Sequence, residues 1–113
     1  MIPFEATDWI TIPPVMRNGE KGVVTSRTKQ YDNFRVRLVE YSPGYKADHW
    51  CSIGHIVYCI DGEFTSLLKD GTEHVISKGM SYQTSDDPHN PHRSVSENGC
   101  TLFIVDGSFL EIE

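Results

Sequence analysis

Short strand-forming runs separated by turn residues constrain the fold of this chain more than any other feature. Valine, isoleucine, threonine, tyrosine and phenylalanine recur in such runs, whereas apolar residues at helical spacing are almost absent. This pattern is typical of antiparallel sandwiches and barrels. The sequence therefore predicts an all-β, single-domain antiparallel β-barrel with at most one helical turn.

Two Asp-Gly pairs interrupt the central runs, at Asp61-Gly62 and Asp70-Gly71. Glycine tolerates a positive φ, so Asp-Gly between apolar runs is a strong hairpin signal. We expect a hairpin at each pair and a polar loop over residues 85–91. The expected strands cover residues 23–28, 34–41, 55–60, 63–68, 74–77, 80–84, 92–96 and 101–105.

The N-terminal segment, residues 1–20, is apolar but broken by Pro3, Pro13 and Pro14. Proline lacks an N–H donor, which confines such a segment to the edge of a sheet. Two interpretations stand equally: an edge strand over its own core, or an arm that joins two subunits of a homodimer. Residues 21–107 are the expected barrel core, and residues 1–113 form one domain.

Charge and cysteine content limit the partners and the compartment. The net charge is −6, and the 10 lysines and arginines are scattered, which argues against a nucleic-acid partner. Three cysteines are an odd number for a disulfide framework. The sequence shows no apolar stretch long enough for a membrane span and no leader at its start, so we expect a cytoplasmic protein without membrane contact.

Four metal-binding side chains gather in two short windows. His49 and Cys51 are two residues apart, which puts both on one face of a strand, and His55 has the same parity beyond Gly54. His92 follows a proline at the end of the polar loop and begins the next strand. Three imidazoles and a thiolate favour a divalent transition metal, Zn, Ni or Cu, with Fe or Mn as alternatives.

The remaining histidines, cysteines and two tyrosines have weaker expected roles. His89 lies mid-loop and could replace or assist His92, whereas His74 follows a hairpin and is expected at the surface. Cys59 shares the parity of His55 and is expected as a buried structural thiol beside the site. Cys100 is expected to have no role. Two aromatic residues complete the expected pocket, Tyr58 and Tyr82.

The first window resembles the first motif of the cupin superfamily, a group of small β-barrels also called jelly rolls or double-stranded β-helices. That motif places Gly, His-x-His, Glu and Gly at set spacings. Here Cys51 stands at the second His and His55 at the Glu. Three histidines and one carboxylate thereby become three histidines and one thiolate, which shifts the implied metal toward Zn, Ni or Cu. The residues on this frame are Gly44, His49, Cys51, His55 and Gly62.

The second cupin motif is matched more loosely, through Gly79 and the Pro91-His92 pair, which implies His92 as the last ligand. More narrowly, Ala47-Asp48-His49-Trp50-Cys51 and the following Gly54-His55-Ile56-Val57-Tyr58 are similar to the small Asp-His-Cys-Trp (DHCW) group. The resemblance extends over about residues 20–107 and implies an RmlC-like cupin barrel.

Two classes of function are consistent with these residues. In the first, the metal serves a small-molecule metalloenzyme of oxygenase or isomerase type. In the second, the barrel is a non-catalytic module that binds a small ligand or senses a metal. A fold shared by many activities does not choose between them. An open coordination position would favour the enzyme.

Overall fold

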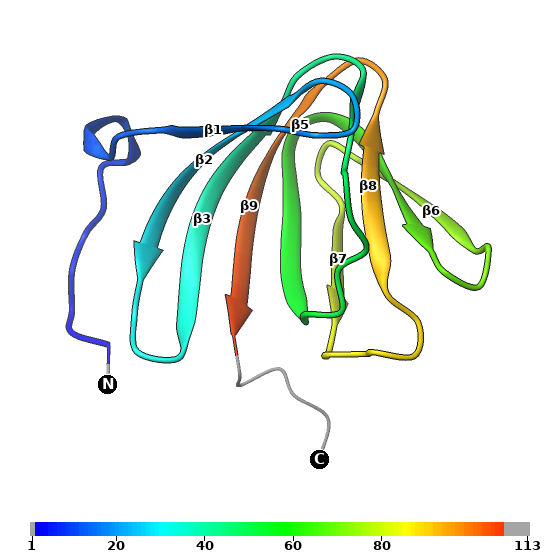
Figure 1. Cartoon of the computed structure of the whole chain (residues 1–113). Helices are drawn as coiled ribbons and strands as arrows, with labels where there is room; N and C mark the ends of the chain where they lie inside the picture. The colour runs from blue at the N-terminus through cyan, green and yellow to red at the C-terminus, as the bar shows by residue number, and fades with distance from the viewer. Residues whose placement is uncertain (1, 108–113) are drawn as a thin grey trace.

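A computed structural model describes residues 2–107. The ends of the expected domain, residue 1 and residues 108–113, lie outside the described residues. Within 2–107 the chain is almost entirely β, with a single 3-10 turn (Figure 1). The elements are η1 (Trp9–Thr11), β1 (Val15–Asn18), β2 (Val23–Gln30), β3 (Phe34–Tyr41), β4 (Tyr45–Lys46), β5 (His55–Leu68), β6 (Glu73–Ser77), β7 (Ser81–Thr84), β8 (His92–Ser96) and β9 (Cys100–Gly107).

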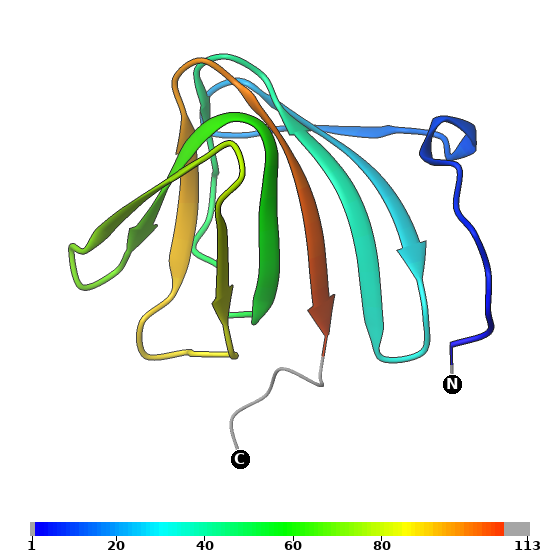
Figure 2. The same ribbon diagram turned by 180° about the vertical axis from the view of Figure 1, so that it is seen from behind.

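Strand β5 is shared by two antiparallel sheets that curl around a common interior. One sheet holds β1, β2, β3 and β9 in that order, and the first half of β5 joins it between β9 and β7. The other sheet pairs the second half of β5 with β6 and β8, and β8 with β4. The two sheets face each other in Figure 1 and, from behind, in Figure 2. This arrangement confirms the predicted all-β antiparallel barrel.

The prediction of a hairpin at Asp61-Gly62 is wrong. Strand β5, which is 14 residues long, continues through this pair without a turn. Gly62 has a φ of 79°, and the register against β9 shifts between Cys59 and Asp61. Glycine is used here for a bulge, which bends a strand and raises its twist. The bend carries β5 from one sheet to the other. At Asp70-Gly71 the expected hairpin is present and connects β5 to β6.

The core lies between the two sheets and is built from side chains of alternate strand positions. In β5, for example, His55, Val57 and Cys59 are buried while the residues between them are exposed. Cys59 is fully buried in this core and does not line the cavity beside His55. The buried hydrophobic cluster comprises Val39, Val57, Cys59, Phe64, Ile76, Cys100, Leu102 and Ile104.

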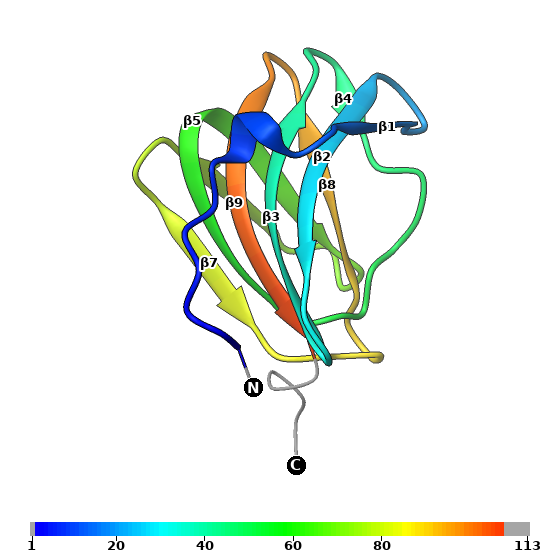
Figure 3. The same ribbon diagram turned by 90° about the vertical axis from the view of Figure 1, so that its left-hand side faces the viewer.

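The N-terminal segment lies across the outer face of its own sheet (Figure 3). Trp9 packs edge-on against Phe103 of β9, with ring centroids 6.1 Å apart. The Arg27 guanidinium donates to the carbonyl oxygens of Trp9 at 3.2 Å and Ile12 at 2.5 Å. Strand β1 then pairs with β2 at the sheet edge. No helix among residues 2–107 is long and apolar enough to cross a membrane.

Candidate metal centre

Cys51 and His92 are held side by side by backbone hydrogen bonds. The amide of Cys51 donates to the carbonyl of His92 at 2.7 Å, and the amide of His92 donates back at 2.9 Å. This isolated antiparallel bridge joins the loop before β5 to the first residue of β8. Through this bridge, closure of the barrel brings His92 beside Cys51.

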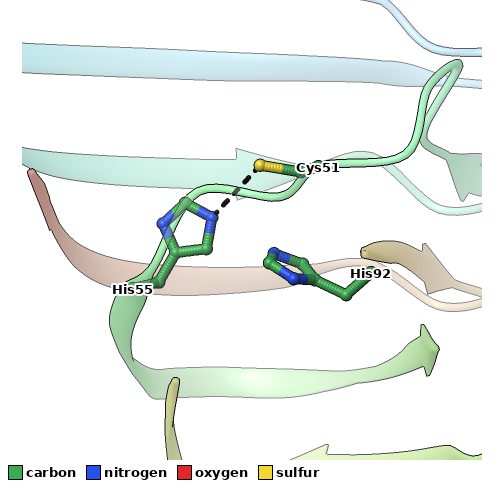
Figure 4. A group of neighbouring side chains, drawn as sticks. All are labelled: Cys51, His55 and His92. Carbon is green, nitrogen blue, oxygen red and sulfur yellow. Dashed lines mark hydrogen bonds between the residues drawn. The ribbon is translucent and has the colours of Figure 1, made fainter. Parts of the chain in front are cut away.

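His55 completes the group from the first position of β5, where β7 and β9 pair with it on either side. Its Nε2 lies 3.6 Å from the Sγ of Cys51. The rings of His55 and His92 are 5.0 Å apart between centroids and nearly perpendicular. In Figure 4 the three side chains converge on one space. Their ligand atoms all lie within 4.8 Å of one another.

These distances and donors fit a soft transition-metal ion. A tetrahedral ion with bonds of about 2.0–2.1 Å to nitrogen and about 2.3 Å to sulfur separates those two ligand atoms by about 3.6 Å. The separation between the His55 Nε2 and the Cys51 Sγ has this value. The remaining separations are up to 4.8 Å, so an ion would draw the donors slightly inward. The buried Nδ1 of His55 has no hydrogen-bond partner in the described part of the chain.

Both histidines of this group are neutral at physiological pH. Burial, and after it the nearby His92, lower the pKa of His55 to about 4, although Asp106 opposes the shift. Burial also lowers the pKa of His92. Metal ions bind the neutral imidazole, so the barrel presents both rings in the protonation state that a metal requires.

The loop that carries Cys51 is secured by the polar loop at residues 85–91. The carboxylate of Asp86 accepts a hydrogen bond from the amide of Gly54. The amide of Asp87 donates to the carbonyl of Ser52 at 2.9 Å. The polar loop at residues 85–91 therefore supports the candidate site.

His49 and His89 are not brought into the group. The side chain of His49 is 73% exposed, and its Nδ1 lies 2.7 Å from the carboxylate of Asp48. It borders the cavity described below, but Cys51 and His55 meet without it because the segment before Cys51 is a loop and not the strand that the parity argument assumed. His89 is exposed within the polar loop, as is His74 on β6.

A cavity of about 340 Å³ lies inside the barrel and reaches the three donors. Tyr82 lines it, as expected, and burial strongly raises the pKa of this phenol, so its hydroxyl remains protonated. Tyr58 is not part of the lining. It alternates with inward-facing Val57 and Cys59, which places its ring on the outer face of the sheet, 46% exposed. A second cavity of about 270 Å³ also borders His92 and Tyr82.

Sequence reasoning missed two arginines that line the cavity and the buried carboxylate that pairs with them. Asp106 of β9 is 3% exposed and accepts hydrogen bonds from the Nε of Arg35 at 2.6 Å and of Arg37 at 3.2 Å. Both arginines line the cavity from β3. Their alternation with Phe34, Val36 and Leu38 is the usual sign of a polar face in solvent, which hides their inward direction.

This chain is similar to known proteins in its three-dimensional structure but not detectably in its sequence. No protein-family model matches the sequence, and no curated protein matches it. Solved structures do match. An RmlC-like cupin from Shewanella frigidimarina aligns over 93% of this chain and 91% of its own, with a TM-score of 0.69 and 17% identity.

Two further structures agree. A predicted oxalate decarboxylase from Thermotoga maritima has a TM-score of 0.75 at 16% identity, covering 91% of this chain and 98% of that one. The polyketide cyclase RemF from Streptomyces resistomycificus has a TM-score of 0.74 at 19% identity, covering 93% and 80%. The chain therefore has the fold of the cupin superfamily. The narrower Asp-His-Cys-Trp group stays a prediction.

Proposed function

We propose that this chain is a metal-binding cupin-fold protein in which Cys51, His55 and His92 hold one divalent transition-metal ion. The convergence of one thiol and two buried imidazoles at the wall of a cavity is the observation that carries the proposal. Sulfur and imidazole donors favour Zn, Ni or Cu over hard cations. Three protein ligands leave a position for a small molecule.

We further propose that the protein is a small-molecule metalloenzyme of isomerase or oxygenase type. When bound, the ion would supply Lewis-acid or redox chemistry to a ligand in the cavity. The chain itself supplies a protonated phenol at Tyr82, which can donate a hydrogen bond to a ligand oxygen. Tyr41, Tyr45 and Phe64 add aromatic surface to the cavity lining.

A second candidate function is a non-catalytic module that binds a ligand or senses a metal. The position of His49 at the cavity rim supports this candidate. If its ring leaves Asp48 and joins the three donors, the coordination sphere is complete. A closed four-ligand site is typical of structural and sensing roles.

Metal analysis of protein purified without added metal tests the metal site. We expect one equivalent of Zn, Ni or Cu per chain, and no retained metal when Cys51 and His55 are both replaced by alanine. Incubation of the loaded protein with oxygen and small organic acids then separates the two candidates. Turnover supports the enzyme, and stoichiometric binding without turnover supports the module.

We also propose that the protein is a homodimer and that it works in the cytoplasm, on two further observations. Ile56, Tyr58 and Ile60 leave an apolar row 40–46% exposed on the outer face of β5. Such a row is typical of a surface that a second subunit covers. All three cysteines are free thiols, in keeping with a reducing compartment.

A further inference from the structure

The charged residues inside the barrel are not balanced. Asp106 is the buried acceptor for both Arg35 and Arg37, so one carboxylate faces two guanidinium groups. One arginine suffices to neutralise one buried carboxylate. Within the described part of the chain, the second positive charge is paired with no further carboxylate, although the whole chain carries a net charge of −6.

Among the described residues, both arginines use Nε and not their terminal nitrogens for Asp106. No hydrogen bond or ion pair within residues 2–107 uses the Nη groups of either side chain. The guanidinium fork binds carboxylate and phosphate oxygens in pairs. The side chains of Arg35 and Arg37 are 38% and 17% exposed and line the cavity, so a ligand can reach them.

Strand register puts this pair beside the candidate metal centre. Arg35 lies opposite Asp106 in the β3–β9 pairing, and Asp106 lies opposite His55 in the β9–β5 pairing. Neighbouring strands are about 4.8 Å apart, so Arg35 and His55 are separated by about 10 Å of backbone. The side chains border the same cavity. A molecule of a few carbon atoms can therefore contact both.

We propose that Arg35 and Arg37 bind the oxyanion of a small anionic ligand, a carboxylate or a phosphate group, and that they direct its other end to Cys51, His55 and His92. The substrate class is then a small organic acid or phosphate ester. Asp106 acts as a positioning residue that holds the two guanidinium groups. A cavity of about 340 Å³ is near the lower limit of small-molecule pockets and suits such a ligand. This inference rests on the proposed metal-dependent function.

Calorimetric titration with succinate and with inorganic phosphate tests the oxyanion site and shows which oxyanion it prefers. Both probes are titrated into metal-free and zinc-loaded wild-type protein. We expect at least one probe to bind, and Arg35→Gln and Arg37→Gln each to weaken it tenfold or more. Lys29→Gln is the matched control, because it removes one positive charge from a side chain that pairs with Glu5 away from the cavity.

Conservative variants keep the test decisive if a glutamine variant does not fold. Arg35→Lys and Arg37→Lys preserve the ion pair with Asp106 but remove the fork, and we expect each to weaken binding several-fold. Unchanged affinity in all four arginine variants, or no binding of either probe to wild type, overturns the oxyanion site. Zinc content is measured in parallel. If the wild-type protein binds an oxyanion but takes up no metal, the proposed metal-dependent function is contradicted and the oxyanion site is retained.

Discussion

His55 is held neutral because barrel closure removes water from its ring, and this has a consequence for stability. Its pKa is about 4 in the folded chain against 6.5 in the unfolded chain. Between these values the unfolded chain binds a proton that the folded chain does not. The free energy of unfolding of the metal-free protein should therefore decrease as the pH falls from 6.5 to 4, by up to about 3 kcal/mol for this residue.

Urea unfolding in the presence of a chelator, repeated across that pH range, measures the effect. The matched variant is His55→Asn, which keeps a polar side chain but does not titrate. We expect its unfolding free energy to depend less on pH than that of wild type, while the carboxylates contribute equally to both. Parallel pH profiles would show that His55 is not the titrating group.

The contrast between His55 and His49 tests which residues hold the metal. Replacement of His55 by alanine removes one of three converging donors, and we expect at least a hundredfold loss of zinc affinity. Replacement of His49, whose ring is exposed beside Asp48, should change the affinity less than threefold. Competition with a chromophoric chelator measures both values. A large loss on His49→Ala would instead support the closed four-ligand site.

At the scale of elements, the bulge at Gly62 decides the path of β5. A side chain at Gly62 would be strained by the φ of 79°, and its Cβ would lie 2.8 Å from the Cα of Cys100. Gly71 has a φ of 95° but open space around it. Substitution of Gly71 would therefore introduce backbone strain alone, whereas substitution of Gly62 would introduce both backbone strain and a steric conflict.

We expect Gly71→Ala to cost about 1–2 kcal/mol of unfolding free energy, which is the backbone penalty alone. Gly62→Ala should cost about 3 kcal/mol or more, because the close approach of β9 adds an overpacking cost to that penalty. Urea unfolding monitored by tryptophan fluorescence gives both values. Equal costs would mean that β9 yields easily to the added methyl group.

At the scale of the whole molecule, the apolar row on the outer face of β5 predicts self-association. Tyr58→Asp places a charge in the middle of this row and should convert a dimer to a monomer. Val75→Asp is the control, because Val75 is 53% exposed on β6, in the other sheet. Light scattering at tens of micromolar measures the mass of each protein. A monomeric wild-type protein would contradict the proposed dimer.

Much of the barrel could be predicted because its determinants are local. Alternation and turn residues identify most strands, as at residues 34–41 and 92–96, whose bounds the structure reproduces. The hairpin at Asp61-Gly62 could not be excluded in this way. A glycine with positive φ serves a turn or a bulge equally well, and the approach of β9 selects the bulge.

In the candidate site, too, some features follow from the sequence and others depend on the tertiary structure. His55 and Cys59 share an inward face through strand parity alone, which the sequence determines. His49 and Cys51 do not follow that rule because they lie in a loop, whose course depends on the bridge to His92. The direction of Arg35 and Arg37 is likewise a tertiary result. Both faces of β3 are half-buried, so its polar residues can turn inward when a buried partner such as Asp106 stabilises their charge.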